Sequence, residues 1–369
     1  MKFLLISPKN RTVWNFRGDL IKSIIDRGYE VTVTGPDTVD IDKIEALGAK
    51  FVEIPMNKNG TNILKDVKYF KNLRRLIKSE KPDVTLGYTV KPVVYGTLAA
   101  SSAGVKNTNC LITGGGYTFT STSLKAKVLG VFVKTLYKTA LRKAKNVIFQ
   151  NPDDLEEFCE KKLVKKEKCF VVNGSGVNME HFSELPMPEE TSFFMLSRLL
   201  YSKGVKEYLL AAEKVKSEYP EARFYLLGKY ETNMQDAVPK DFVEGFIEKG
   251  IVKRFEETSD VRPYYEKSSV YVLPSYREGT PRTVLEAMAC GRPVITTDTN
   301  GCRETVKDGV NGYLVPVADA DKLAEKMILF LKDKSLCAAM GKNSVEYCKE
   351  KFDVVRVNAD MMSIMKINN

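Results

Sequence analysis

The chain has 369 residues, 43% of them hydrophobic and 28% charged, which is enough chain for two globular domains. This composition excludes a disordered protein, and no uncharged stretch is long and apolar enough to predict a membrane span. The net charge of +10 is uneven: residues 1–178 carry 30 basic and 17 acidic side chains, whereas residues 179–369 carry 27 and 30. A basic first half indicates a polyanionic partner, such as nucleic acid, anionic lipid or a phosphorylated substrate.

The chain contains seven cysteines and a single histidine, His181. No two cysteines form a C-x-x-C pair, so the sequence predicts reduced thiols and no metal site. One histidine also excludes mechanisms that need several. The run of four apolar residues at 3–6 is too short for an export signal and predicts a buried first strand, so we expect a cytoplasmic protein.

Short β-branched runs alternate with amphipathic stretches through the first half. The clearest helical pattern covers residues 62–80, where apolar residues recur at steps of three and four. Alternation of strand and helix predicts a parallel, doubly wound sheet. The expected strands are residues 2–6, 30–34, 51–54, 83–86, 108–113, 146–150 and 169–172.

The alternation breaks at residues 173–176, a glycine-rich stretch that we take as the domain boundary. We therefore predict an α/β protein with two Rossmann-like, doubly wound domains facing each other across a cleft. The first domain would cover residues 1–176 and the second 177–349, with a C-terminal helix at about 350–369 packing back onto the first. The strands expected in the second domain are residues 193–197, 223–227, 270–273, 293–297 and 312–315.

A strand, a loop and a capped helix are predicted between residues 270 and 291. Thr280 suits the N-cap, Pro281 the first helical position and Gly291 the end of the helix. A helix N-terminus at the carboxyl edge of a sheet is a site for a diphosphate. The backbone N–H groups available there belong to Arg282, Thr283 and Val284.

Two carboxylates flank this anion site, Glu278 in the loop and Glu286 in the helix. Four residues from Arg282 to Glu286 give roughly 6 Å of helix rise, close to the span from a phosphate to its ribose. A carboxylate can accept two charge-assisted hydrogen bonds from vicinal hydroxyls. We predict that Glu286 binds a ribose and that Glu278 meets the group on the other phosphate, the alternative being two solvated glutamates.

Two cations follow the first strand of the second domain, Arg198 and Lys203. They lie on a predicted strand-to-helix loop, at the edge where open parallel sheets bind ligands. Together they could neutralise a departing nucleoside diphosphate without a metal ion. The alternative is that both are ordinary surface bases.

These motifs resemble those of the retaining glycosyltransferases of family 4. The resemblance covers the second domain closely and implies the GT-B fold, with a nucleotide sugar bound by the second domain and an acceptor by the first. It implies that Glu278 and Gly279 contact the donor sugar, that Arg198 and Lys203 contact the diphosphate, and that no cofactor or metal is needed. The motifs are Arg198 with Lys203-Gly204, Glu278-x7-Glu286, and residues 285–295 and 308–315.

The first domain resembles family members that extend polyprenyl-diphosphate-linked or capsular sugars, in residues 15–17 and 114–119. Many relatives place histidines after the fourth strand, whereas this chain has Lys91 there, and we expect Lys91 to hold an acceptor phosphate. A merely structural lysine and a bare glycine loop remain the alternatives. The expected acceptor-binding residues are Asn15, Arg17, Lys91, Gly115, Gly116 and Tyr117.

Residues 123–146 read as a basic amphipathic helix, and we expect it to lie on an anionic membrane surface. A core helix with lysines on its wet face is the alternative. The expected contacts are Lys127, Lys134, Lys138 and Arg142.

The sequence thus predicts a retaining, metal-independent glycosyltransferase, bound peripherally to the inner face of the plasma membrane. It would transfer a hexose or N-acetylhexosamine from a UDP-sugar to a polyprenyl-diphosphate-linked saccharide, like N-acetylgalactosaminyltransferases that act on a lipid-linked amino sugar. Two alternatives are a nucleotide-sugar epimerase of the same fold, disfavoured by the single histidine, and a basic nucleic-acid-binding protein. The latter is disfavoured because aromatic residues are not interleaved with the bases.

Overall fold

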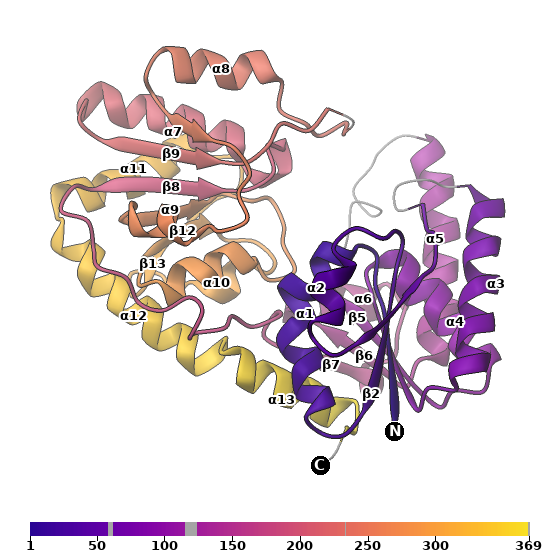
Figure 1. The fold of residues 1–369 in the computed structure, drawn as a ribbon. Coiled ribbons are helices and arrows are strands. Elements are labelled where there is room, and N and C mark those ends of the chain that lie inside the picture. Colours follow the sequence, from indigo (N-terminus) through magenta and orange to yellow (C-terminus); the bar gives the residue numbers. More distant parts are fainter. Residues whose placement is uncertain (58–61, 115–123, 233, 368–369) are drawn as a thin grey trace. The chain divides into compact units, whose positions relative to one another are not determined.

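The computed structural model describes residues 1–57, 62–114, 124–232 and 234–367, with side chains in the helix at 124–143 described from Lys134 onward. The chain forms two compact units (Figure 1). Unit 1 comprises Met1–Ser175 and Val354–Asn369, and unit 2 comprises Gly176–Asp353. The C-terminal segment therefore returns to the unit in which the chain begins.

In its described residues, unit 1 contains a seven-stranded parallel sheet in the order β3-β2-β1-β4-β5-β6-β7. The order reverses between β1 and β4, so the connections that follow these two strands leave toward opposite faces and open a crevice at the carboxyl edge. The strands are β1 (Lys2–Ile6), β2 (Glu30–Gly35), β3 (Lys50–Glu53), β4 (Val84–Tyr88), β5 (Asn107–Ile112), β6 (Asn146–Phe149) and β7 (Cys169–Val171).

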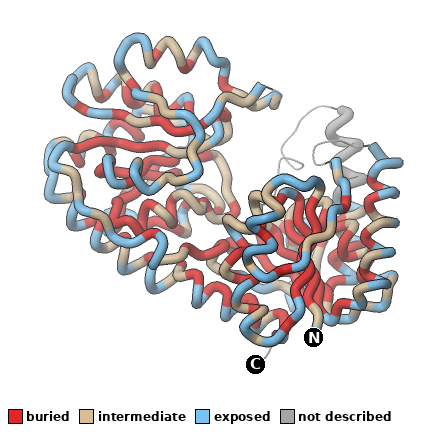
Figure 2. Tube along the Cα trace, in the orientation of Figure 1, coloured by how far each residue is buried: buried red, intermediate tan, exposed pale blue. Residues whose placement is uncertain are grey.

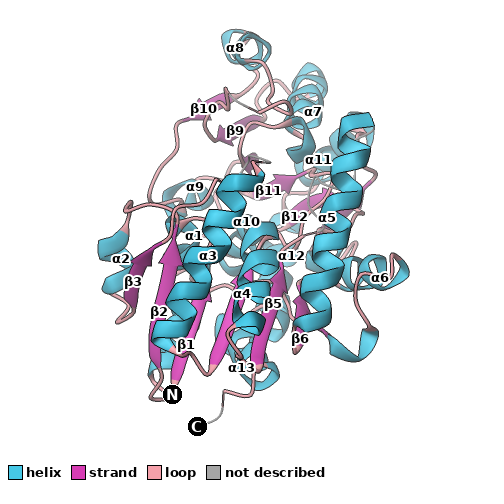
Figure 3. Cartoon of the chain, turned by 90° about the vertical axis from the view of Figure 1, so that its right-hand side faces the viewer, coloured by secondary structure: helices cyan, strands magenta, loops and turns pink. Residues whose placement is uncertain are grey.

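Helices cover both faces of this sheet, and alternate residues of β1 show which helices lie on each face. Phe3 and Leu5 pack in one core with α1 and α13, whereas Leu4 and Ile6 pack in another with α3 and α4. Figure 2 shows the buried strands, and Figure 3 shows α3, α4 and α5 together in front of the sheet. The helices are α1 (Asn10–Ile25), α2 (Ile41–Glu45), α3 (Ile63–Glu80), α4 (Thr97–Ser102), α5 (Leu124–Lys143), α6 (Pro152–Glu160) and α13 (Val354–Ile364), with short helices η1 (Pro92–Gly96) and η3 (Lys166–Lys168).

Two asparagine side chains attach the C-terminal segment to the sheet of unit 1. The amide of Asn107 donates to the carbonyl of Met365 at 2.7 Å, and that of Asn146 donates to the carbonyl of Ile364 at 2.9 Å. Both acceptors are backbone carbonyls at the end of α13. The two hydrogen bonds therefore hold the end of the helix, while its apolar face packs in the core. The segment after Val354 is thus part of the first core.

Unit 2 repeats the plan, with a sheet in the order β10-β9-β8-β11-β12-β13 across its described residues. Here the order reverses between β8 and β11. Its strands are β8 (Ser192–Leu196), β9 (Arg223–Leu227), β10 (Lys253–Phe255), β11 (Val270–Leu273), β12 (Val294–Thr297) and β13 (Gly312–Val315). Its helices are α7 (Val205–Glu218), α8 (Lys240–Glu248), α9 (Arg262–Glu266), α10 (Arg282–Ala289), α11 (Ala320–Lys332) and α12 (Ser335–Lys351), with η4 (Tyr201–Lys203) and η5 (Arg303–Thr305).

Within the described ranges, none of the helices combines the length and the hydropathy that a bilayer-spanning segment requires.

Strand β10 was not predicted from the sequence. It is an edge strand of three residues, two of them charged, and it forms parallel pairs with β9 only. Short, charged edge strands lack the apolar run by which buried strands are recognised. The other strands lie within two residues of the predicted ranges.

Helix α3 begins where predicted, because the side chain of Asn62 caps it by accepting from the N–H of Lys65. Its buried face, however, differs from the simple apolar pattern. Leu73 and Ile77 are buried as the pattern predicts, together with Tyr69, but Ile63 and Val67 are 65% and 43% exposed. The apolar residues of its first turns are thus left at the surface.

Gly204 permits a close approach in unit 2 between the connection that follows β8 and the connection that follows β11. It has a φ of +73°, and a Cβ at this position would lie 2.0 Å from the carbonyl oxygen of Pro274. Gly204 joins η4 to α7 after β8, and Pro274 follows β11. Only glycine allows these two segments to touch in this conformation.

Gly204→Ala should therefore destabilise unit 2 by about 2–4 kcal/mol, because alanine is strained in the left-handed conformation and its Cβ would clash with the carbonyl of Pro274. Gly245→Ala is the matched control, since Gly245 lies inside α8 and a Cβ added there would have no neighbour within 4 Å. The control should gain about 0.5–1 kcal/mol. Urea unfolding of both variants measures the difference, and wild-type stability of Gly204→Ala would contradict the close approach.

Candidate functional site

Lys203 and Glu278 form an ion pair at the point where the strand order of unit 2 reverses. The Nζ of Lys203 lies 2.5 Å from Oε1 of Glu278, and the two side chains are 22% and 15% exposed. Lys203 ends η4 after β8, and Glu278 lies in the loop after β11. The structure therefore brings together two residues that the sequence placed in separate motifs.

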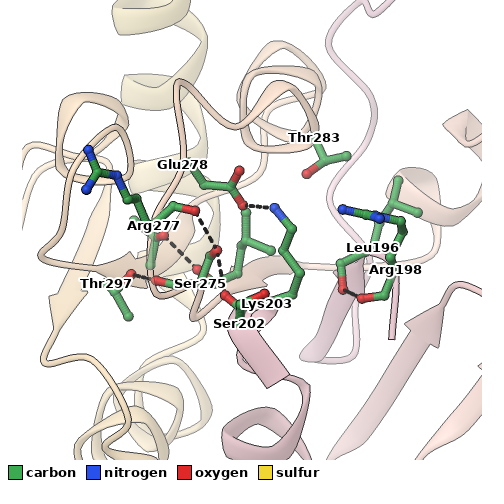
Figure 4. Close-up of polar contacts among 12 residues, drawn as sticks. Leu196, Arg198, Ser202, Lys203, Ser275, Arg277, Glu278, Thr283 and Thr297 are labelled. Carbon is green, nitrogen blue, oxygen red and sulfur yellow. Dashed lines mark hydrogen bonds and ion pairs between the residues drawn. The ribbon is translucent and has the colours of Figure 1, made fainter. Parts of the chain in front are cut away.

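Arg198 comes from the same connection as Lys203 but is exposed. Its Nη1 lies 3.3 Å from the Sδ of Met234. In the view of Figure 4 the guanidinium of Arg198 points toward Nζ of Lys203, and the side chain of Thr283 is directed to the same side of the site. The two cations and the start of α10 thus face one region at the carboxyl edge of the sheet, where an anion would meet positive charge from several sides.

The loop that carries Glu278 is supported by the connection that follows β12. The N–H of Glu278 donates to the carbonyl of Asn300 at 3.1 Å. Gly301 has a φ of +75°, and a Cβ there would lie 2.5 Å from the carbonyl oxygen of Glu278. Asn300 and Gly301 were not predicted as site residues from the sequence, although an Asn-Gly pair after a strand is a strong turn signal.

A buried carboxylate, Glu207, supports the same loop from α7. Glu207 is 5% exposed, and its Oε1 accepts from the hydroxyl of Tyr276 at 2.9 Å. Burial and this carboxylate raise the pKa of Tyr276 to about 12. The N–H of Tyr276 also donates to the carbonyl of Ser202 at 2.9 Å, which ties the Glu278 loop to the residue before Lys203.

Ser202, the residue before Lys203, is in turn held by hydrogen bonds to the carboxylate of Asp236. Its N–H donates to Oδ2 of Asp236 at 3.2 Å, its hydroxyl donates to the same oxygen, and its carbonyl accepts from the hydroxyl of Ser275 at 3.1 Å. These contacts fix η4 against the loop after β11. Glu207, Asp236 and Tyr276 were not predicted from the sequence, because their roles depend on pairings between distant segments.

Helix α10 begins one residue later than predicted. Pro281, expected as the first helical residue, has the extended ψ of 107° and stands at the N-cap position. Thr280, expected as the cap, instead donates its hydroxyl proton to the carbonyl of Gly279 at 3.0 Å. The N–H of Val284 donates to the carbonyl of Pro281 at 3.1 Å, so the prediction that it is available to an anion was wrong.

Glu286 lies within α10, its side chain only 12% exposed, and is held by two partners. Its Oε1 accepts from Nε of Arg282 at 3.1 Å, and its Oε2 lies 3.2 Å from the hydroxyl of Tyr265. Burial raises the pKa of Glu286, although Arg282 and Tyr265 oppose this effect. Arg282, predicted only as a backbone donor, thus also contributes its side chain, which further donates from Nη1 to the carbonyl of Gly176 at 2.6 Å.

Thr283 also contributes a side chain to this region. Its Oγ1 lies 2.7 Å from the hydroxyl of Tyr271, which in turn lies 3.1 Å from the carbonyl of Leu196 at the end of β8. The first turn of α10 is therefore fixed to β8 and β11 at once. This arrangement keeps the beginning of the helix at the carboxyl edge of the sheet.

The residues predicted to bind an acceptor lie in unit 1, and two of the described ones, Arg17 and Lys91, lie near the end of β4. Arg17 is buried, its guanidinium 5.4 Å from the centre of the Tyr88 ring, and Asn15 is half-buried on the same helix. Lys91 is paired through Nζ with Oδ1 of Asp66 at 2.5 Å. Asp66, which was not predicted from the sequence, is the acid that anchors α3 to the loop after β4. Gly115, Gly116 and Tyr117 lie outside the described residues.

The described half of α5 uses its apolar face for the core of unit 1. Tyr137 and Leu141 are 4% and 0% exposed and belong to one cluster with Phe149. Lys134 and Arg142 are exposed and Lys138 is half-buried, whereas the side chain of Lys127 lies outside the described residues. For this half, the structure has the features of the alternative interpretation, a core helix with basic residues on its wet face.

Two family models match the chain. Residues 2–151 match the family described as Glycosyl transferase 4-like, and residues 177–347 match Glycosyl transferases group 1. The first match covers the strands of unit 1 up to β6, and the second covers the site of unit 2.

Curated relatives extend over most of the chain. An N,N'-diacetylbacillosaminyl-diphospho-undecaprenol alpha-1,3-N-acetylgalactosaminyltransferase of Campylobacter jejuni is 28% identical over 360 residues, covering 94% of this chain and 93% of that protein. A UDP-Gal:alpha-D-GlcNAc-diphosphoundecaprenol alpha-1,3-galactosyltransferase of Escherichia coli is 28% identical, covering 88% of this chain and 84% of that protein.

Solved structures with the same fold include a sucrose-phosphate synthase from Thermosynechococcus elongatus, with a TM-score of 0.82 and 19% identity over 99% of this chain and 98% of that one. The Anabaena protein HepE in complex with UDP and glucose has a TM-score of 0.78 and 18% identity, covering 99% of each chain. The GT-B fold expected from the sequence is confirmed.

The raised pKa of Glu286 predicts how stability depends on pH. An unfolded glutamate titrates near 4.3, so the folded state binds this proton more tightly and loses stability as pH rises from about 4.3 through the higher folded pKa. Glu286→Gln carries no charge and escapes this loss. We expect the variant to melt above the wild type at pH 8, with a difference that shrinks toward pH 4.

The exposed Glu248→Gln on α8 is the control for the change in net charge. Melting curves at the two pH values decide the outcome. A difference between Glu286→Gln and wild type that is independent of pH would contradict a raised pKa.

Proposed function

Because this chain is a glycosyltransferase whose two units match the Glycosyl transferase 4-like family and Glycosyl transferases group 1, we propose that it transfers a sugar from a UDP-sugar to a polyprenyl-diphosphate-linked saccharide. The observation that carries the donor half of the proposal is the Lys203–Glu278 pair beside Arg198 and the start of α10. The acceptor half is supported by the two relatives named for undecaprenyl-diphosphate-linked acceptors. The transferred group would be a hexose or an N-acetylhexosamine.

In this proposal unit 2 binds the donor. Arg198, Lys203 and the N–H groups of Arg282 and Thr283 hold the diphosphate, and Glu286 accepts hydrogen bonds from the ribose hydroxyls. Glu278 and Gly279 contact the sugar. The Lys203 ammonium has three donors, so it can bind a phosphate oxygen while Glu278 remains its partner.

The reaction would retain the configuration of the sugar. The acceptor oxygen forms a bond to the anomeric carbon on the face from which the diphosphate leaves, and the bond from that carbon to the phosphate oxygen breaks. The acceptor hydroxyl gives its proton to the departing diphosphate, whose growing charge Arg198 and Lys203 stabilise. In this proposal the two cations neutralise the diphosphate without a metal ion.

Unit 1 would bind the acceptor at the carboxyl edge of its sheet. Lys91 lies just after β4, where it can approach a diphosphate, and the buried Arg17, whose guanidinium lies against the Tyr88 ring, would add positive charge at the same end of β4, while Asn15 can hydrogen-bond the saccharide. Lys91 already has one carboxylate partner, Asp66, so its ammonium is oriented before the acceptor binds. The enzyme would work at the inner face of the plasma membrane, where lipid-linked acceptors are embedded.

The test is acceptor-dependent release of UDP. A panel of UDP-sugars is incubated with the protein, with and without a polyprenyl-diphosphate-linked saccharide in detergent, and with EDTA in a parallel set. We expect UDP release that requires the acceptor and is unaffected by EDTA. NMR of the product should show that the anomeric configuration is retained. Lys203→Ala should lower kcat by about 10²–10³ with a smaller change in KM, because it removes a preorganised donor.

Other outcomes separate the alternatives. An epimerase would interconvert UDP-sugars without releasing UDP, and a nucleic-acid-binding protein would turn over none of them. Inhibition by EDTA would contradict only the metal independence and would leave the proposed transfer reaction intact.

Glu207 and Tyr276 should act as positioning residues for Lys203 and Glu278. Tyr276→Phe removes only the hydroxyl that Glu207 accepts, and a small shift of a catalytic loop is costly, so kcat should fall about tenfold or more. Glu207→Gln keeps an accepting oxygen and should retain most of the rate.

Tyr230→Phe is the matched control, because the hydroxyl of Tyr230 donates to Oε1 of Glu244 on α8 at 2.7 Å, in a Tyr–Glu hydrogen bond of the same kind. Both phenylalanine variants should lose about 0.5–1.5 kcal/mol of stability, whereas only Tyr276→Phe should lose kcat. Equal rates for the two would contradict a positioning role.

A further inference from the structure

The first turns of α3 expose three large apolar side chains. Leu64 is 81% exposed, Ile63 is 65% exposed and Val67 is 43% exposed. They are consecutive or one helical turn apart, so they lie on one side of the helix. We call this group the α3 apolar patch. Elsewhere on α3 Tyr69, Leu73 and Ile77 are buried and Phe70 and Leu76 are half-buried against the same core, so the patch is a local departure.

Basic residues surround the α3 apolar patch. Two acids occur in α3: Asp66 is buried and paired with Lys91, and Glu80 is paired with Lys50 at the far end of the helix. The solvent-facing surface of α3 is therefore apolar at its beginning and positive along its length. The exposed bases are Lys65, Lys68, Lys71, Arg74, Arg75 and Lys78.

The α3 apolar patch lies at the carboxyl edge of the first sheet. Helix α3 follows β3, whose carboxyl end is at that edge, and it then runs back to the start of β4 (Figure 3). The loop with Lys91 follows β4 at the same edge, and the Asp66–Lys91 ion pair joins it to the second turn of α3. The patch is therefore beside the region proposed for the acceptor's diphosphate.

We propose that α3 is the element through which unit 1 docks on an anionic bilayer, with Ile63, Leu64 and Val67 entering the interface. An interfacial helix needs exposed apolar side chains next to bases that meet anionic headgroups, and both are present on α3. The described half of α5, by contrast, has its apolar residues in the core. This inference rests on the proposed function, because a lipid-linked acceptor requires the enzyme at a membrane.

The test uses the full chain with a single tryptophan as the reporter. The sequence has one tryptophan, Trp14, so Trp14→Phe combined with Leu64→Trp places the only indole in the patch. Trp14→Phe combined with Val355→Trp is the matched control, because Val355 is also exposed (74%) on a helix of unit 1. Vesicles of phosphatidylglycerol and phosphatidylcholine should shift the emission of the Leu64→Trp reporter to shorter wavelength and leave that of the Val355→Trp reporter unchanged.

Vesicle sedimentation measures how strongly each variant partitions onto the vesicles. Lys65, Lys68 and Lys71 changed together to Gln should lower partitioning onto these vesicles by about 10²-fold, since each base near an anionic surface contributes roughly fivefold. Ile63, Leu64 and Val67 changed together to Ser should lower it at least about tenfold. The comparison variant is Lys134, Lys138 and Arg142 to Gln on α5, which should change it less than the α3 bases do.

Loss of binding in the α5 variant with normal binding of the α3 variants would overturn the proposal, as would a Leu64→Trp spectrum unchanged by vesicles. A shift of the Leu64→Trp emission with detergent-dispersed lipid-linked acceptor but not with vesicles would assign the patch to the acceptor's chain instead. UDP release in detergent is measured on the same variants. Absent release with intact vesicle binding would defeat the proposed function alone, and normal release without vesicle binding would defeat only the docking inference.

Discussion

The reversal of strand order in a parallel sheet is the constraint on which the rest of this protein depends. Once β1 and β4, or β8 and β11, become neighbours, the connections after them must leave toward opposite faces. Each sheet then has one place where its carboxyl edge is not covered by a crossover. The described polar and charged residues that we propose to bind the donor or the acceptor come from the segments that follow these four strands.

In unit 2 the open edge is stabilised by contacts between backbone and side chain rather than by a closed hydrophobic core. Gly204 lets the two connections touch, Tyr276 joins them through Ser202 and Glu207, and the Asn300–Gly301 turn supports the loop from behind. The ion pair of Lys203 and Glu278 is the outermost part of this arrangement. Such a network fixes the charged groups before any ligand arrives, which is what electrostatic stabilisation of a leaving group requires.

The sequence predicted the features that local patterns encode. Buried strands and the helix after Pro281 follow from hydrophobic runs and turn residues, and the two acids and two cations of unit 2 follow from their positions after strands. The start of α10 was misplaced by one residue, because whether a proline is the cap or the first helical residue depends on its ψ. Asp66, Glu207 and Asp236 were missed, because an isolated acid in a helix or loop shows no pattern until its distant partner is known.

The same limit applies to α3, where a regular apolar period gives no sign that its first turns face solvent. Asp66 lies three residues after Ile63, or about 4.5 Å along the helix axis. With the beginning of α3 resting on a bilayer, Lys91 would stand at the level of the lipid phosphates. A polyprenyl-linked diphosphate lies at that same depth, so the acceptor could be engaged without lifting its chain out of the hydrocarbon. The Asp66–Lys91 contact would then set the height at which the enzyme works above its membrane.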